Sequence, residues 1–365
     1  MPAYKTGTIK LPLHGGKAPA WLFSRMKKLS REILLLMASE YGAELIMEKI
    51  SEPLWFQALG CVLGFDWHSS GVTTTVCGAL KEASKNIEKD TGLYIAGGKG
   101  ATSRKTPAEI ENIQEETGNN LKGLVYASRM SAKVDSNALQ DGYQLYHHCF
   151  FFTPDGNKWA VVQQGMNDST GFARRYHWLG DRVSDFVCEP HSAICCDSKS
   201  EVLNLVAQDS LLARNTITEL SKHTPKSVVN DFLLIKKSAE KQYQMPSGHD
   251  IFTTDIDKNR FEKILLKTYE NKPKNFEELL AIPGVGPRTI RSLAMISELV
   301  YGVKHNITDP ARFGFAHGGK DGIPYPVDRT TYDRSIEILH GIVTNAKIDR
   351  TEKITALKRL SHFYK

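Results

Sequence analysis

Side chains that could bind a divalent cation are concentrated in the first half of the chain. Asp66 and His68 lie in one short stretch between predicted helices, and Asp141 precedes a predicted strand that carries His147 and His148. Carboxylate, imidazole and amide ligands suit Mg²⁺ or Mn²⁺, and a bound divalent ion can activate water for attack on a phosphodiester. The pattern therefore predicts a metal-dependent phosphodiester hydrolase.

The two adjacent histidines belong to a predicted β-hairpin. An Asp-Gly dipeptide at residues 155–156 separates two runs rich in aromatic and β-branched residues, which predicts a two-residue turn. That turn places His147 opposite Gln164 and His148 opposite Gln163, with one pair on each face of the sheet. The candidate catalytic residues are Asp66, His68, Lys99, Asp141, His147, His148 and Gln164. The candidate metal ligands among them are Asp66, His68, Asp141 and His148.

A glycine-rich loop at residues 97–105 carries Lys99, Arg104 and Lys105 ahead of a helix that begins near Pro107. Flexible backbone amides beside cationic side chains favour a phosphate group. The loop lacks the Gly-x4-Gly-Lys-Ser/Thr spacing of a nucleotide-binding P-loop. A solvated loop without a ligand is the alternative interpretation.

The stretch at residues 282–287 has two glycines two positions apart, between two helical patterns. Asn275 and Glu278 have the spacing of a capping box before the first helix, and Pro287 suits the first position of the second. Backbone amides at the start of that second helix would favour an anion. A tight turn without a ligand is the alternative interpretation.

Residues 282–287 and the flanking patterns resemble the helix-hairpin-helix motif, whose Gly-Val-Gly hairpin holds a DNA backbone phosphate. The residues predicted to bind DNA are Gly284, Val285, Gly286, Arg288, Thr289 and Arg291, together with Arg104 and Lys105. Because one hairpin contacts few phosphates, a homodimer or the basic face of Lys27, Lys28 and Arg31 would be needed to strengthen binding without sequence preference.

Composition describes an ordinary globular protein. The 365 residues are 41% hydrophobic and 24% charged, and 47 Lys and Arg against 41 Asp and Glu give a net charge of +6, which is compatible with nucleic acid. None of the six cysteines forms a Cys-x-x-Cys pair, so we expect them to be buried thiols rather than zinc ligands. The absence of an 18-residue apolar run or a signal-peptide pattern predicts a cytoplasmic protein without a membrane partner.

The expected fold class is α+β. Residues 1–200 are expected to form a mainly helical catalytic domain with a small antiparallel sheet around the 143–164 hairpin. Residues 201–244 read as a helical connector, and residues 245–365 as an all-α helix-hairpin-helix domain.

Six motifs distributed along most of the chain resemble a family of archaeal and thermophilic-bacterial proteins filed as a domain of unknown function. The resemblance implies a prokaryotic protein with a C-terminal helix-hairpin-helix, and it implies no reaction. The motifs are Leu13-His14-Gly15-Gly16, Gly64-Phe65-Asp66-Trp67-His68-Ser69-Ser70-Gly71, Gly97-Gly98-Lys99-Gly100, Asp141-Gly142-Tyr143-Gln144-Leu145-Tyr146-His147-His148, Gln163-Gln164-Gly165-Met166-Asn167 and Phe315-Ala316-His317-Gly318-Gly319-Lys320.

Three functions remain open at this point. The first is a metal-dependent nuclease in DNA repair or processing. The second is a base-excision glycosylase, because Asp328 at a helix start resembles the catalytic Asp of glycosylases that contain the hairpin; Phe313, Phe315 and Tyr325 could line a base pocket. Arg288 stands where the lyase-active members of that glycosylase family carry Lys, which argues against a Schiff-base mechanism. The third is a non-catalytic binder of DNA structures.

Overall fold

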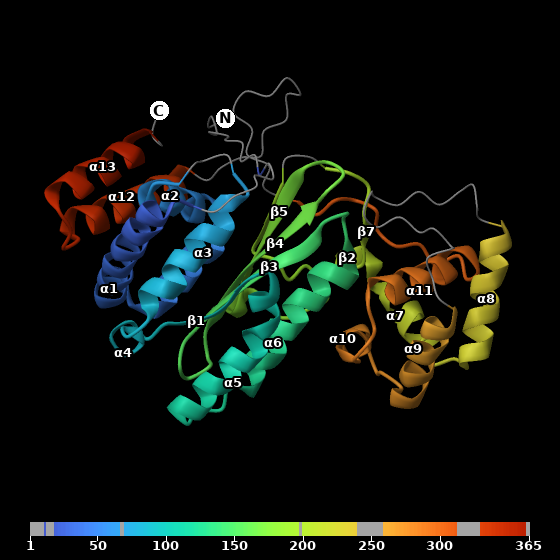
Figure 1. Cartoon of the computed structure of the whole chain (residues 1–365). Coiled ribbons are helices and arrows are strands. Elements are labelled where there is room, and N and C mark those ends of the chain that lie inside the picture. Colours follow the sequence, from blue (N-terminus) through green and yellow to red (C-terminus); the bar gives the residue numbers. More distant parts are fainter. Residues whose placement is uncertain are drawn as a thin grey trace, which may run out of the picture.

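The computed structural model describes residues 11, 18–65, 69–196, 199–238, 258–311 and 329–362. Several residues that the sequence selects lie outside these ranges, namely Asp66, His68, Phe313, Phe315, Tyr325 and Asp328. A five-stranded antiparallel sheet lies at the centre of the described chain, with helices against both faces (Figure 1). In spatial order its strands are β1 (Tyr94–Lys99), β3 (Gln144–Phe152), β4 (Trp159–Asn167), β5 (Phe172–Leu179) and β6 (Ala193–Cys195).

One face of the sheet is covered by the first helices of the chain. These are α1 (Ala20–Ser51), which breaks at Gly42, α2 (Pro53–Leu63) and α3 (Gly71–Ser84), with the short α4 (Glu88–Thr91) leading into β1. Cys149, Phe151 and Val162 point into this layer, where they join one continuous apolar core. Their alternation along the strands follows from the two-residue period of β-structure.

The opposite face is covered by α5 (Thr106–Thr117) and α6 (Lys122–Lys133), which follow the short 3₁₀-helix η1 (Gly100–Lys105). Phe150, Phe152 and Val161 point into this second core. A π-helical segment, η2 (Val134–Ala138), extends α6, and β2 (Leu139–Gln140) follows it. Both faces of the hairpin are therefore buried.

The register of the 143–164 hairpin is confirmed. His147 pairs with Gln164 and His148 with Gln163, as predicted. The connecting turn is longer than the predicted two residues, because the Thr153 amide donates to the Lys158 carbonyl and the Gly156 amide donates to the Thr153 carbonyl. A bulge between Leu145 and His147 shifts the pairing beyond that point.

The second half of the chain is helical apart from β7 (Leu203–Asn204), which pairs with β2, and the single turns η3 (Gly180–Arg182) and η4 (Gln208–Ser210). Helices α7 (Leu211–Leu220) and α8 (Pro225–Ser238) come from the expected connector, and they pack against α9 (Lys258–Asn271) and α11 (Pro287–Leu299). Helix α10 (Phe276–Ala281) precedes α11. The α+β class with a small antiparallel sheet is confirmed in this form.

The last two helices, α12 (Arg329–Asn345) and α13 (Arg350–His362), pack beside the first two. Figure 1 shows α12 and α13 in red next to α1 and α2 in blue. Ile338, Leu339 and Leu360 belong to the same core as Ile33 and Phe56. Residues from the two ends of the chain thus share one apolar layer. Among the described residues, no helix combines the length and apolar character needed to cross a membrane.

Candidate nucleic-acid-binding cleft

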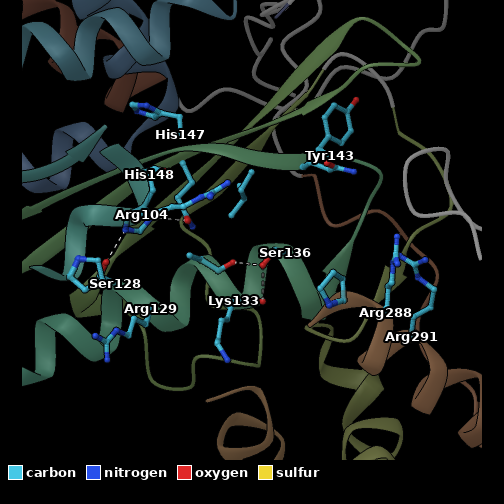
Figure 2. Close-up of a pocket in the computed structure, with 17 residues that line it drawn as sticks. Arg104, Ser128, Arg129, Lys133, Ser136, Tyr143, His147, His148, Arg288 and Arg291 are labelled. Carbon is cyan, nitrogen blue, oxygen red and sulfur yellow. Dashed lines mark hydrogen bonds between the residues drawn. The ribbon is translucent and has the colours of Figure 1, made fainter. Parts of the chain in front are cut away.

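Four segments that are distant in sequence enclose a cleft of about 780 Å³. Its walls are η1, α6 with η2, the bulged half of β3 with Gln163 of the paired β4, and the start of α11. Figure 2 shows Arg104, Ser128 and His148 on one side of the cleft and Arg288 and Arg291 on the other. The structure therefore brings together part of the predicted catalytic set and part of the predicted DNA-binding set.

The lining of this cleft is strongly basic. Five of the lining residues are cationic, and within the described chain no Asp or Glu lines it; the five are Arg104, Arg129, Lys133, Arg288 and Arg291. Three of these side chains, those of Arg104, Arg129 and Arg288, are exposed. Arg129 also lies 3.6 Å from the Glu111 carboxylate, which is outside the lining. The excess of positive charge in the lining raises the local concentration of anionic ligands.

His148 lies in a chain of buried hydrogen bonds that opens onto the cleft. Its Nε2 atom is 2.9 Å from the Ser128 Oγ atom, and its Nδ1 atom is 2.8 Å from Gln163 Oε1. Gln163 Nε2 donates to Asp135 Oδ2 at 2.6 Å. Asp135 also accepts from the indole of Trp178 at 3.0 Å and contacts His191 Nε2 at 2.5 Å.

This chain determines the tautomer of His148. Because the amide nitrogen of Gln163 donates to the Asp135 carboxylate, the amide oxygen must face the imidazole. That oxygen only accepts, so Nδ1 carries the proton and Nε2 accepts from the Ser128 hydroxyl. Burial lowers the pKa of His148 to about 4, with the Gln163 contact opposing the shift, and burial raises the pKa of Asp135.

The sequence singled out His148 and, among the clustered polar residues of the first half of the chain, Asp135, but it missed Ser128 and the π-helical backbone at Asp135. A π-helical segment inside or at the end of an α-helix is a frequent feature of functional sites. The signal available in the sequence is the helical spacing of Ser128, Ala132 and Ser136, a stripe of small residues along α6 and η2 that lines the cleft.

His147 lies on the opposite face of the sheet from His148, and Figure 2 shows it pointing away from the cleft. Its imidazole is 1% exposed, and neither ring nitrogen has a hydrogen-bond partner. Burial lowers its pKa to about 3, with the charges of His148 and Lys99 adding to the effect. Gln164, also on this face, donates to the Ser70 carbonyl at 2.9 Å and accepts from Thr73.

Asp141, a predicted metal ligand, belongs to a buried ionic cluster. Its Oδ2 atom accepts from Arg174 Nη1 at 2.8 Å and from the Tyr176 hydroxyl at 2.7 Å. Arg174 also contacts Asp309 Oδ2 at 2.7 Å. Burial raises the pKa of Asp141 even though Arg174 opposes the shift. Asp141 is not a lining residue of the cleft, so the structure does not bring it together with His148 there.

The predicted phosphate loop contributes one of its cations to the cleft. Arg104 lines it, whereas Lys99 lies over the ring of Tyr146 with its amine 5.7 Å from the ring centroid. Lys105 is exposed beside the lining. Gly97, at φ +92°, allows the close approach of β1 to β3, because a Cβ atom there would lie 2.2 Å from the His148 carbonyl oxygen.

The last residue of α6, Lys133, and Gln140 of β2 hold the turn between α10 and α11 in place. Lys133 donates to the carbonyls of Leu280 and Ile282, the latter at 3.1 Å, and Gln140 donates to the Pro287 carbonyl at 2.9 Å. The Gln140 amide oxygen in turn accepts from Arg291 Nε at 2.7 Å. These contacts fix the start of α11 at the cleft.

Within the turn, the predicted DNA-binding residues separate into buried and accessible groups. Gly284, at φ +98°, and Arg288 are exposed, and Gly286 is half-buried. The side chains of Val285 and Thr289 are 3% exposed, so only their backbone atoms could contact a ligand at this surface.

Comparisons with known proteins agree with the resemblance noted in the sequence. Neither the curated proteins nor the solved structures gave a match to the chain. A family model described as "Protein of unknown function (DUF763)" matches residues 7–327, which is most of the chain. The chain therefore belongs to the DUF763 family of proteins of unknown function.

Proposed function

We propose that this protein binds the phosphodiester backbone of DNA in the cleft between α6 and the start of α11. The observation that carries the proposal is the convergence of five Arg and Lys side chains on a cleft that no carboxylate of the described chain lines. Duplex DNA carries one phosphate charge per about 1.7 Å of its axis, and contacts to those charges supply most non-specific affinity. A backbone ligand accounts for the charge without requiring any base-specific contact.

The turn between α10 and α11 supports the same ligand, and we interpret it as a helix-hairpin-helix. The start of α11, which presents Pro287 and Arg288, lines the cleft and offers the positive end of a 13-residue helix. Gly286 adopts an extended backbone at φ −131°, and a Cβ atom there would meet nothing closer than the Gly284 carbonyl oxygen at 3.9 Å. A phosphate oxygen can therefore approach this backbone closely.

The substitution Gly286→Ala tests that approach without disturbing the fold. The backbone conformation suits alanine and the space is open, so stability should stay near that of the wild type. The added methyl group would stand between the amides and the phosphate. We expect affinity to fall about tenfold, equivalent to about 1.4 kcal/mol, for every DNA sequence alike.

Fluorescence anisotropy with labelled single-stranded and duplex oligonucleotides measures this effect. Gly123→Ala is the matched control, because Gly123 is exposed in α6 and a Cβ atom there meets nothing within 4 Å. A folded Gly286→Ala protein that binds DNA as tightly as the Gly123→Ala control would contradict a phosphate contact at this turn.

Phosphodiester hydrolysis is the reaction that we propose for the bound DNA. The Asp141 carboxylate, a predicted metal ligand, is engaged by Arg174 and Tyr176. A mechanism with Mg²⁺ or Mn²⁺ therefore depends on the other predicted carboxylate and imidazole ligands, Asp66 and His68, which lie outside the described residues. The described residues also favour a second, metal-independent mechanism. The observation behind it is the 2.9 Å contact between the Ser128 hydroxyl and the His148 imidazole within the basic cleft.

In this second mechanism Ser128 is the nucleophile and His148 the general base. Ser128 Oγ attacks the phosphorus as its proton passes to His148 Nε2, and the proton then moves to the departing sugar oxygen as the P–O bond breaks. Water hydrolyses the resulting phosphoserine by the reverse proton route. Gln163 and Asp135 hold the imidazole in the required tautomer, and Arg104 stabilises charge on the phosphorane.

The substitution Ser128→Ala separates the two mechanisms. If the serine attacks, Ser128→Ala should cleave labelled DNA about a thousandfold more slowly than the wild type, or slower still. Cleavage by the wild type should then be unaffected by EDTA. Ser131→Ala is the control, because Ser131 is equally buried on α6 and donates only to the Ser128 carbonyl, at 3.2 Å. Cleavage that survives in Ser128→Ala and is abolished by EDTA would instead support the metal-dependent mechanism.

A further inference from the structure

Two cysteines and a histidine meet beneath α3, on the face of the sheet opposite the cleft. Cys77 comes from α3, and His147 and Cys149 come from β3, two residues apart and therefore on one face of the strand. The two sulfur atoms and an imidazole nitrogen all lie within 4.8 Å of one another. All three side chains are about 1% exposed.

The histidine of this cluster has both ring nitrogens without a hydrogen-bond partner. A buried imidazole normally has a partner for its N–H group and for its lone pair, so this side chain needs an explanation. An imidazole nitrogen within 4.8 Å of two thiol sulfurs supplies the donor atoms of a transition-metal site. The neutral form of an imidazole is the form that binds a metal.

We propose that Cys77, His147 and Cys149 bind a zinc ion that links α3 to β3. Zn–S bonds of about 2.3 Å and Zn–N bonds of about 2.0 Å place tetrahedral ligand atoms about 3.5–3.8 Å apart. The ligand atoms lie within 4.8 Å of one another, so each pair needs to close by about 1.3 Å at most. Soft thiolate ligands select zinc over Mg²⁺, which distinguishes this site from the carboxylate site predicted from the sequence.

Charge balance suits a buried site. Binding replaces the two thiol protons with the ion and releases both protons to solvent, so one Zn²⁺ and two thiolates carry no net charge. A neutral cluster avoids the penalty of an isolated buried ion. The three protein ligands leave one tetrahedral position for water or a further donor. Since all three ligands are buried, the ion would act structurally, holding β3 in place behind His148.

The test is elemental analysis of the full-length protein purified under reducing conditions, with and without added zinc. We expect about one zinc per chain in the wild type and in Cys195→Ser, and loss of that zinc in Cys77→Ser and Cys149→Ser. Cys195 is the matched control, because it is a buried thiol that lies outside the cluster. Removal of the ion should lower the Tm of the wild type by on the order of 10 °C.

A measurement on the unaltered protein guards against variants that fail to fold. Cobalt added to the metal-free wild type should give the thiolate-to-cobalt charge-transfer absorption of a two-sulfur tetrahedral site. Titration with a thiol reagent should release the ion as the two thiols react. Wild-type protein that contains no metal after exposure to zinc, gives no such absorption with cobalt, or carries a Cys77–Cys149 disulfide under reducing conditions would overturn the proposal.

Discussion

Replacing Arg174 with leucine is expected to destabilise the fold by about 3–5 kcal/mol. The guanidinium is fully buried and makes ion pairs with Asp141 at 2.8 Å and with Asp309 at 2.7 Å. Leucine would leave two buried carboxylates without their countercharge, and the cost of an unpaired buried charge exceeds the gain from added apolar surface. The loss should also release the segment around Asp309 from β5.

Arg175→Leu provides a matched comparison one residue further along β5. Arg175 is also fully buried, but it faces the other side of the sheet, where it lies over the Phe56 ring, donates to Gln57 at 3.1 Å and contacts the Cys195 thiol. Its Nε and Nη2 atoms find no oxygen acceptor. We expect this variant to lose less than about 2 kcal/mol.

Urea denaturation followed by circular dichroism measures the free energy of unfolding of both variants. The account predicts that Arg174→Leu is the less stable of the two by at least about 2 kcal/mol. Equal stability would mean that the cluster of Arg174, Asp141 and Asp309 contributes no more than ordinary burial, and Asp141 would again be a candidate ligand.

Removing three exposed arginines from the cleft is expected to weaken DNA binding by about a hundredfold to a thousandfold. The triple variant is Arg104→Ala, Arg129→Ala and Arg288→Ala, whose side chains line the cleft and face solvent. A charge-assisted contact to a phosphate contributes about 1–1.5 kcal/mol after partial solvent screening, so three such contacts contribute about 3–4 kcal/mol. Stability should change little, because surface substitutions away from special features usually have small effects.

The control removes the same charge from other surfaces. Lys89→Ala, Lys226→Ala and Arg350→Ala lie on α4, α8 and α13, and all three residues are exposed. The account predicts near wild-type affinity for this control. Equal weakening in the two triple variants would show that net charge, rather than the cleft, attracts DNA.

Features governed by local chemistry could be predicted from the sequence. The Asp-Gly turn and the alternating strands determine the pairing of His147 with Gln164. The N-cap of α10 is as predicted, since Asn275 accepts from the Glu278 amide at 2.8 Å. The Glu278 carboxylate accepts from the Lys274 amide at 2.8 Å, one residue before the N-cap amide that a capping box would use. Each of these signals acts over a few residues, and distant packing does not alter it.

Features that depend on distant partners could not be predicted. The sequence predicts a helical connector from residue 201, but Leu203–Asn204 forms β7 because it pairs with β2 more than sixty residues earlier. Such tertiary pairing overrides local propensity. Asp141 has the position of a metal ligand in the sequence, and only the approach of Arg174 and Asp309 gives it another role.

The cleft and the cluster of Cys77, His147 and Cys149 could not be predicted from the sequence for the same reason. Arg104, Ser128 and Arg288 meet only after α5, α6 and α11 have packed, and no motif spacing connects them. Cys77 and Cys149 do not have the sequence spacing of a zinc motif, yet α3 against β3 brings them together.

The dependence of DNA affinity on salt concentration tests the central claim most directly. Each phosphate contact contributes about 0.7–0.9 to the slope of log K against log salt concentration. We predict that the triple arginine variant has a slope shallower than that of the wild type by about 2–3, whereas the Lys89, Lys226 and Arg350 control retains the wild-type slope. Identical slopes for the wild type and the arginine variant would contradict DNA backbone binding in the cleft.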